Sequence, residues 1–411
     1  MDLSEILSAT IVLASVFAYV NHRWIKWPPT IGVMVLALLS SIVVIVLGEF
    51  IPVFLEKAVV LVAKLDFQKV LFNFMLSFLL FAGAVQVNAR KLKKERLSVL
   101  VLSTVGIVIS TFLIGGLSWY LFQLFQIQVA FVYCMLFGAL ISPTDPIAVL
   151  AILKEAKIPS SLEVKISGES LFNDGVAVVL FISIAEIATN GIQHFDAFEV
   201  IKLFVREAVG GLVFGVILGY TGFLALRPID NYKVEVLITL AIVMGGYAIA
   251  GHLHISGPLA MVVAGIITGN KVKDEVMSDV TQDYLIKFWE LIDEILNAIL
   301  FLLIGMEMLI IKINFTVFII GIIIVLIVLL TRWISVWIPI YFLQYWIKFE
   351  KNAVLILTWG GLRGGLSVAL ALSLTPAMHK NEFVLITYIV VVFSIIVQGL
   401  TIGPLAKKLN K

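Results

Sequence analysis

A short polar segment within an apolar stretch carries residues that could bind a cation. It reads Gly-Glu-Ser-Leu-Phe-Asn-Asp-Gly over residues 168–175, and it places Ser170 one helical turn before Asp174. A hydroxyl beside a carboxylate offers only oxygen ligands, which suit a small hard cation such as Na⁺ or Li⁺. The same carboxylate could hold a proton instead. We therefore predict that a cation and a proton compete for Asp174.

A second polar segment could complete this cation site. Residues 142–146 read Ser-Pro-Thr-Asp-Pro, and the two prolines would interrupt a helix and free backbone carbonyl groups. The freed carbonyls around Thr144 could join Ser170 and Asp174, so we predict a Na⁺ site at these three residues. Asp145 could lie beside this site, near the positive N-terminal end of a half-helix, or could simply cap that half-helix.

The other charges in apolar stretches are interpreted mainly as structural. A charge at the centre of a membrane helix costs at least about 2.5 kcal/mol, so it is expected to be paired or functional. We predict a buried ion pair between Glu169 and Arg363, of which Arg363 lies in the glycine-rich segment 360–365. Glu307 and Arg332 are interpreted as charges that line a cavity or pack between helices.

Membrane-spanning helices must position these residues. The chain of 411 residues is 61% hydrophobic and 14% charged, whereas soluble domains carry about 25% charged residues. A spanning helix needs about 20 mostly apolar residues. We predict about thirteen spans, over residues 3–21, 28–54, 69–88, 98–124, 129–154, 165–190, 200–226, 234–252, 256–270, 287–311, 315–345, 352–375 and 382–406. Residues 1–411 then form a single transmembrane domain, with no soluble regulatory domain.

Two of these spans are predicted to be broken. The fifth contains the prolines of 142–146, and the twelfth contains the glycines of 360–365. Breaks at membrane depth require protein or a watery cavity to satisfy the freed backbone groups. If the first six and the last six spans are inverted repeats, both breaks fall at the fifth position of a repeat. In transporters, this arrangement places a binding site where broken helices cross at the midplane.

The remaining sequence features define the topology and narrow the class of protein. Lys and Arg gather on alternate connections between spans, which places the N-terminus outside and the C-terminus in the cytoplasm. The basic residues form no stripe for nucleic acid. Cys134 is the single cysteine, so no disulfide or thiolate metal site is expected, and no nucleotide motif is present. These features favour an ion-coupled secondary transporter in the lipid bilayer, which is not an enzyme and needs no cofactor.

The chain resembles the monovalent cation:proton antiporter-1 family, which includes bacterial NhaP-type antiporters and animal sodium/hydrogen exchangers. The resemblance covers most of the chain and is strongest at residues 142–146, 168–175, 255–260 and 361–365. It implies that Asp174 alternately binds the cation and the proton. Ser170 and the backbone near Thr144 would supply further ligands.

The resemblance also implies roles for neighbouring residues and a mode of exchange. Asn173 and Asp145 would shape the crossing of the broken helices, and Glu169 would pair with Arg363. Related electrogenic antiporters have a second aspartate where this chain has Asn173, so electroneutral exchange of one Na⁺ or Li⁺ for one proton is implied, by alternating access. The core bundle would include spans 5, 6 and 12, and the remaining spans would form the scaffold of a homodimer.

The chain departs from the family pattern in two places. Ala82 stands in the third span where many members have an acidic residue, so it replaces a possible cation ligand or pH-tuning group, and the cation affinity and the pH set-point stay open. The chain also ends at Lys411 soon after the last span, without the long cytoplasmic tail of many relatives. We expect from this compact architecture a protein of a prokaryotic plasma (inner) membrane, with a role in pH homeostasis.

Three alternatives stay open. K⁺ could replace Na⁺ as the exchanged cation. A cation channel or uniporter would move the cation without protons. An intramembrane aspartyl protease would use Asp145 and Asp174 as an acid/base pair, although neither residue lies in the Gly-x-Gly-Asp setting expected of such enzymes.

Overall fold

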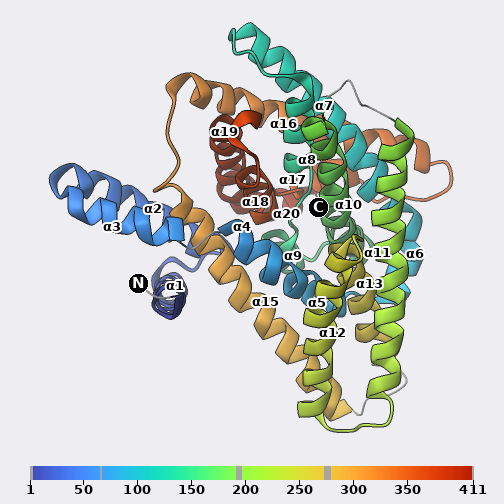
Figure 1. Ribbon diagram of the computed structural model, residues 1–411. Helices are drawn as coiled ribbons and strands as arrows, with labels where there is room; N and C mark the ends of the chain where they lie inside the picture. Colours follow the sequence, from blue (N-terminus) through green and yellow to red (C-terminus); the bar gives the residue numbers. More distant parts are fainter. Residues whose placement is uncertain (1–2, 65–66, 191–196, 273–278, 410–411) are drawn as a thin grey trace.

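The protein folds into helices joined by short connections (Figure 1). The computed structural model describes residues 3–64, 67–190, 197–272 and 279–409. Its α-helices are α1 (Leu3–Val20), α2 (Pro29–Phe50), α3 (Pro52–Lys64), α4 (Phe67–Val70), α5 (Leu76–Gln86), α6 (Ala89–Val101), α7 (Ile107–Leu124), α8 (Phe131–Ile141), α9 (Ile147–Glu155), α10 (Ser160–Asn190), α11 (Ala197–Leu226), α12 (Tyr232–His252), α13 (Gly257–Ile267), α15 (Asp279–Glu307), α16 (Phe315–Leu343), α17 (Ala353–Trp359), α18 (Gly365–Leu372), α19 (Lys380–Phe393) and α20 (Gly399–Leu409).

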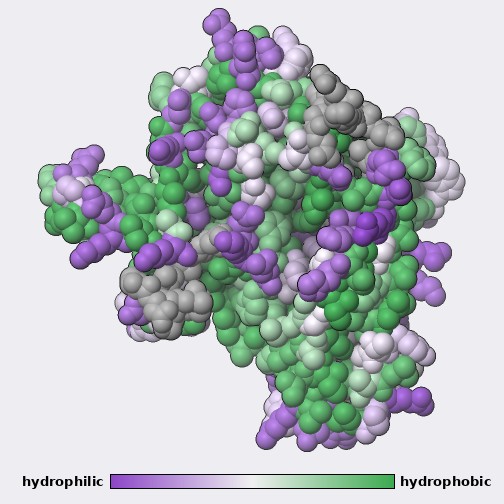
Figure 2. Space-filling view, viewed as in Figure 1, coloured by the Kyte–Doolittle hydropathy of each residue, from purple (hydrophilic) through white to green (hydrophobic). Residues whose placement is uncertain are grey.

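Long apolar helices dominate this fold. Within the described residues, eight helices are long and apolar enough to cross a membrane, α10, α11, α12 and α16 among them. Figure 2 shows a largely apolar surface over α11 and α12, which ends in polar side chains at the bottom of the view. An apolar exterior is what contact with lipid requires, because each backbone polar group is satisfied inside its helix. The predicted all-α membrane fold is confirmed, whereas the number of spans, the sides of the termini and the inverted repeats stay predictions.

Most of the helix α3 lies outside the predicted spans, and only its first three residues fall within the span 28–54. The predicted span 28–54 ends in the structure at Phe50, and α3 begins at Pro52. Proline fits the first turn of a helix but cannot continue one, which explains the new start. The sequence of α3 contains Glu56, Lys57 and Lys64, and these charges explain why most of it falls outside the predicted spans.

The two predicted breaks are confirmed. The segment 142–146 separates α8 from α9, and the segment 360–364 separates α17 from α18. The two connections run antiparallel, and the backbone amide of Asp145 donates a hydrogen bond of 2.8 Å to the carbonyl oxygen of Leu362. The two broken helices therefore cross each other at these segments.

Helices from distant parts of the chain surround the crossing. α10 packs against α6, α8 and α9 and also contacts α17, while α16 packs against α7, α17 and α19. α15 packs against α2, α5 and α12 and contacts α18. The broken helices at the crossing are therefore contacted by α10, from the middle of the chain, and by α15, from its second half.

Of the five π-helical turns in the described part of the chain, three join two α-helices directly into one longer helical segment. These turns are Leu71–Met75 between α4 and α5, Leu102–Gly106 between α6 and α7, and Ser394–Gln398 between α19 and α20. A π turn inserts one extra residue into a helix and often occurs near functional sites. The last of the three lies beside the crossing.

Candidate functional site

The side chain of Arg363 closes one end of the crossing. Its guanidinium donates hydrogen bonds to the backbone carbonyls of Ser142 and Pro143, the latter at 3.0 Å, and only 1% of the residue is exposed. These carbonyls follow the last turn of α8, where carbonyl groups lack partners within the helix and carry partial negative charge. Arg363 therefore satisfies and neutralises the C-terminal end of α8.

The backbone of the segment 360–364 is fixed by the π turn between α19 and α20. The amide of Arg363 donates to Ser394 Oγ at 2.9 Å, and the hydroxyl of Ser394 donates to Gln398 Oε1 at 2.7 Å. The side-chain amide of Gln398 then donates to the carbonyl oxygen of Trp359 at 3.2 Å. One helical turn thus holds the end of α17 and the middle of the connection together.

Asp145 lies at the crossing directly against the backbone of Gly364. A Cβ atom at Gly364 would overlap the carboxylate of Asp145, so this close approach requires glycine. Gly364 immediately precedes α18, and the N-terminal end of a helix carries partial positive charge that favours a carboxylate. Asp145 is partly exposed and lines a cavity. Its charge is therefore accessible from the cavity, unlike that of Arg363.

Three of the predicted site residues, Thr144, Ser170 and Asn173, bond to each other next to the cavity. The hydroxyls of Thr144 and Ser170 are hydrogen-bonded at 3.1 Å. The side-chain amide of Asn173 donates to Thr144 Oγ1 at 2.8 Å, and its carbonyl oxygen accepts from the backbone amide of Thr144 at 3.4 Å. All three residues are buried. Asn173 therefore ties the connection between α8 and α9 to α10.

Asp174 lines the cavity one helical turn after Ser170. Asp145 and Ser170 line the same cavity. The carboxylate of Asp174 has no hydrogen-bond or ion-pair partner among the residues that the structure describes. The structure thus brings Thr144, Asp145, Ser170, Asn173 and Asp174 into one region, and the carboxylate of Asp174 is available to bind a cation or a proton.

Glu169 pairs with a different arginine from the one that the sequence analysis predicts. Its carboxylate accepts hydrogen bonds from Arg332, at 2.5 Å from Nη1 and 3.0 Å from Nη2, and Nη2 also donates to the carbonyl of Leu357 at 3.1 Å. The predicted ion pair with Arg363 is wrong, because the Arg363 guanidinium instead binds the carbonyls at the end of α8. The buried pair therefore ties α10 to α16, and Arg332 is an ion-pair partner.

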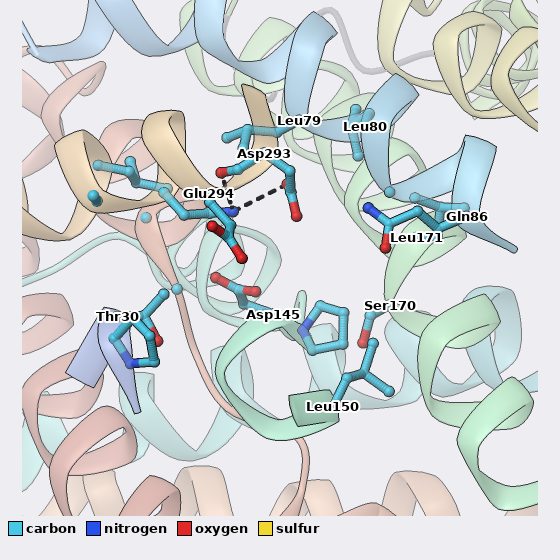
Figure 3. A pocket seen from close by; sticks show the side chains of 18 of the residues that line it. Thr30, Leu79, Leu80, Gln86, Asp145, Leu150, Ser170, Leu171, Asp293 and Glu294 are labelled. Carbon is cyan, nitrogen blue, oxygen red and sulfur yellow. Dashed lines mark hydrogen bonds between the residues drawn. The ribbon is translucent and has the colours of Figure 1, made fainter. Parts of the chain in front are cut away.

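The cavity has a volume of about 1030 Å³ and reaches acidic residues that the sequence analysis did not single out. Asp293, Glu294 and Asn297 on α15 all line it. Figure 3 shows the carboxylates of Asp293 and Glu294 on the side of the cavity towards Asp145. The signal was present in the sequence, since acids three and four residues after Glu290 lie on one helix face.

Two further positions from the sequence analysis, Glu307 and Ala82, are buried in the structure. Glu307 is buried at the C-terminal end of α15 with 6% exposure, outside the lining of this cavity, and it interacts electrostatically with Lys380. It is therefore a charge packed between helices that does not line this cavity. Ala82 is fully buried within α5, and its neighbour Gly83 lines the cavity.

Known proteins with similar sequences span nearly all of this chain. The family model described as the transmembrane sodium/hydrogen exchanger matches residues 11–408. The chain is 48% identical over 410 residues to the Na⁺/H⁺ antiporter NhaP of Pseudomonas aeruginosa, which covers 98% of this chain and 96% of that protein. It is 36% identical over 350 residues to the Na⁺/H⁺ antiporter NhaH of Halobacillus dabanensis, with 84% of each covered.

A solved structure has a similar fold. The sodium proton antiporter MjNhaP1 from Methanocaldococcus jannaschii at pH 8 matches with a TM-score of 0.77 over 100% of this chain and 99% of that one, at 18% identity. The family consists of transporters, so the protease alternative is wrong. The two sequence relatives are bacterial, in agreement with the expected prokaryotic plasma membrane. Since the family match and the 48% identity both extend over nearly the whole length, this integral membrane protein belongs to the sodium/hydrogen exchanger family.

Proposed function

We propose that this protein exchanges Na⁺ or Li⁺ for H⁺ across the membrane, with Asp174 as the group that both ions share. The environment of Asp174 carries this proposal. Its carboxylate lines a cavity, lies one helical turn from Ser170, and has no hydrogen-bond or ion-pair partner in the described part of the chain. The Na⁺/H⁺ antiport activity in the names of the bacterial relatives supports the same function.

The ligands around Asp174 suit a small hard cation. The carboxylate of Asp174, the hydroxyl of Ser170 and oxygen atoms of Thr144 would coordinate the substrate cation. All of these ligands are oxygens, which Na⁺ and Li⁺ prefer. The hydrogen bond between the hydroxyls of Thr144 and Ser170 holds these two groups close together when no cation is bound.

The coupling of cation and proton movement follows from the free-energy cost of a carboxylate at Asp174 that has neither ion bound. A bare charge in an apolar environment is strongly disfavoured, and either a cation or a proton relieves this cost. Asp174 would therefore change sides of the membrane only with one of the two bound. Cation movement in one direction then requires proton movement in the other.

A ratio of one cation to one proton is supported by Asn173. Its amide group forms hydrogen bonds with the backbone and side chain of Thr144, and a side-chain amide, unlike a carboxylate, does not ionise near neutral pH. Of the two adjacent residues that face this region, only Asp174 can therefore change its charge. We infer electroneutral exchange.

Alternating access would come from movement between two groups of helices. α10 and the two broken helices belong to a bundle with α6, α7, α16 and α19, whereas α2, α5 and α12 each pack against α15. The second group would be the scaffold of a homodimer, and the cavity would open to one side at a time as the bundle moves.

Proteoliposomes that contain a pH-sensitive dye provide the test. After a pH gradient is imposed, Na⁺ or Li⁺ added to wild-type protein should drive proton movement, and an imposed membrane potential should leave the rate unchanged. Asp174→Asn should reduce this movement to the level of protein-free liposomes. Asp283→Asn is the matched control, because Asp283 is an exposed acid on α15 that pairs with Lys287 outside the cavity.

The possible results separate the alternatives. Full Na⁺-driven proton movement by Asp174→Asn would contradict the role of Asp174. A response to K⁺ alone would replace the cation but keep the mechanism. Cation flux without any proton movement would indicate a channel or uniporter.

A further inference from the structure

The cavity has a second polar wall, which the proposed exchange at Asp174 does not use. On α15, Asp293 and Asn297 are one helical turn apart, and both line the cavity. On α18, Ser367 lines the cavity as well. Figure 3 shows Asp293 and Glu294 on the wall that faces Asp145, with Ser170 on a different side of the space.

Asn297 holds Asp293 in place and leaves one oxygen unused. Its side-chain nitrogen donates to the backbone carbonyl of Asp293 at 2.8 Å and to Asp293 Oδ1 at 3.0 Å. The residue is only 2% exposed. The other atom of this amide, Asn297 Oδ1, is buried and has no hydrogen-bond partner among the described residues. A buried acceptor without a partner is unfavourable, so it indicates a ligand that the protein itself does not supply.

Ser367 shows the same feature from another helix. It is 1% exposed, and its hydroxyl oxygen is also buried without a hydrogen-bond partner in the described part of the chain. α15 and α18 are in contact, and both residues line one cavity. Two unsatisfied oxygens from two different helices therefore border the same cavity, and the carboxylate of Asp293 borders it as well.

The chemistry of these groups points to a cation. A carboxylate, an amide oxygen and a hydroxyl oxygen are ligands of hard cations such as Na⁺. Asp293 also interacts electrostatically with Asp145. Two carboxylates of the same sign repel each other, and a cation between them would remove this repulsion.

We propose that Asp293, Asn297 and Ser367 form a second cation-binding station in the cavity, which the cation occupies before it reaches Asp174. The identity of the cation as Na⁺ rests on the proposed function. The station joins α15 to α18, so it combines a helix of the scaffold group with a half-helix of the crossing. A cation held there would be released when the two groups of helices move apart.

Binding of radioactive Na⁺ to the purified protein in detergent tests the station directly. Wild type should bind Na⁺, and Asp174→Asn should keep a weaker, saturable binding that the double variant Asp174→Asn with Asp293→Asn loses. If Asp174→Asn alone abolishes all saturable binding, the second station is refuted. The proposed function is refuted by a different result, which is continued exchange by Asp174→Asn in proteoliposomes.

Exchange kinetics in proteoliposomes provide the second test. Asp293→Asn should raise the apparent KM for Na⁺ by about tenfold or more, the range seen when a supporting group of a metal site is lost, while the maximal rate is largely kept. Glu290→Gln is the matched control, since it removes a negative charge from an exposed position at the edge of the cavity on the same helix. Equal KM values for Asp293→Asn and Glu290→Gln would overturn the proposal.

Ser367→Ala separates a ligand from a structural residue. Because the hydroxyl has no partner within the described protein, its removal should leave the thermal unfolding midpoint unchanged or slightly raised. A ligand role predicts a higher apparent KM for Na⁺ in spite of this unchanged stability. An unchanged KM would remove Ser367 from the station.

Discussion

Two regions of α10 differ in whether their charged side chains have a partner of opposite charge. Near the start of the helix, Lys165 Nζ lies 3.2 Å from a carboxylate oxygen of Glu95 and 3.1 Å from one of Glu350, above the ring of Phe349, and its side chain is 0% exposed. About two and a half turns later, Asp174 has no comparable partner within the described residues and lines the cavity.

This difference in pairing distinguishes charges that stabilise the fold from a charge that is proposed to bind an ion. In the locked cluster, which we define as Glu95, Ser161, Lys165 and Glu350, each charged group faces an opposite charge on another segment. In the open site, which we define as Thr144, Ser170, Asn173 and Asp174, the first three side chains form hydrogen bonds with each other, and the carboxylate of Asp174 has no partner in the part of the chain that the structure describes. Between the two regions, Glu169 is fully paired with Arg332 although it is adjacent to Ser170.

The largest effect on stability is expected from breaking the Glu169–Arg332 pair. Glu169→Gln leaves Arg332 charged and buried, and loss of one partner of a buried pair costs about 3–5 kcal/mol. The thermal unfolding midpoint of the purified protein should fall clearly. Glu199→Gln, which removes an exposed partner of Lys202, is the control and should leave the midpoint unchanged. Equal midpoints for the two variants would contradict a structural role for Glu169.

A smaller effect is expected from Gly364→Ala, which changes no charge. The new methyl group would overlap the Asp145 carboxylate, and such overpacking costs about 1–3 kcal/mol. Because Asp145 borders the cavity, Na⁺-driven exchange should fall as well. Gly116→Ala on α7 is the control, since a Cβ atom there meets no atom within 4 Å. Normal exchange by Gly364→Ala would show that the position of Asp145 is not critical.

The locked cluster should affect stability without affecting ion binding. Lys165→Met removes the charge, and Glu95 and Glu350 can then be hydrated, because their side chains are 18% and 22% exposed. We expect a loss of about 1.5–3 kcal/mol, the usual contribution of hydrogen bonds to charged groups. The apparent KM for Na⁺ in proteoliposomes should stay at the wild-type value. A raised KM would mean that the two regions of α10 are coupled.

The smallest effect concerns the pH dependence of the locked cluster. Burial alone would raise the pKa of Glu350, but hydrogen bonds from Ser161, from its own backbone amide and from Lys165 lower this pKa below its ordinary value of 4.5. A lowered pKa in the folded state means that the stabilisation is present at neutral pH and is lost as the pH falls below about 4.5. Glu350→Gln should therefore weaken the fall of the unfolding midpoint in acid. Parallel pH profiles of the variant and wild type would contradict this assignment.

The backbone of the site could be predicted from the sequence because prolines and glycines act locally. Pro143 and Pro146 break one helix whatever surrounds it, and the glycines of 360–364 mark the other break. The spacing of Ser170 and Asp174 likewise follows from helix geometry alone. These features required no knowledge of which helices are neighbours.

The partners of charged side chains could not be predicted in the same way. Glu169 is close enough to interact electrostatically with Arg363, and only the packing of α16 decides that Arg332 forms the ion pair. The proposed role of Asp293 in cation binding depends on the packing of α15 against the crossing, and no local sequence pattern specifies this packing. α3 was missed because its charges made it resemble a connection.

The π turn at Ser394–Gln398 makes the crossing depend on the length of the chain as well as on its composition. One residue more or less in a helix rotates everything beyond it by about 100°, since an α-helix has 3.6 residues per turn. Deletion of a single residue from this turn would move Ser394 or Gln398 away from the segment 360–364, even if every polar group were kept. The site is therefore more vulnerable to a one-residue deletion in α19–α20 than to many substitutions there.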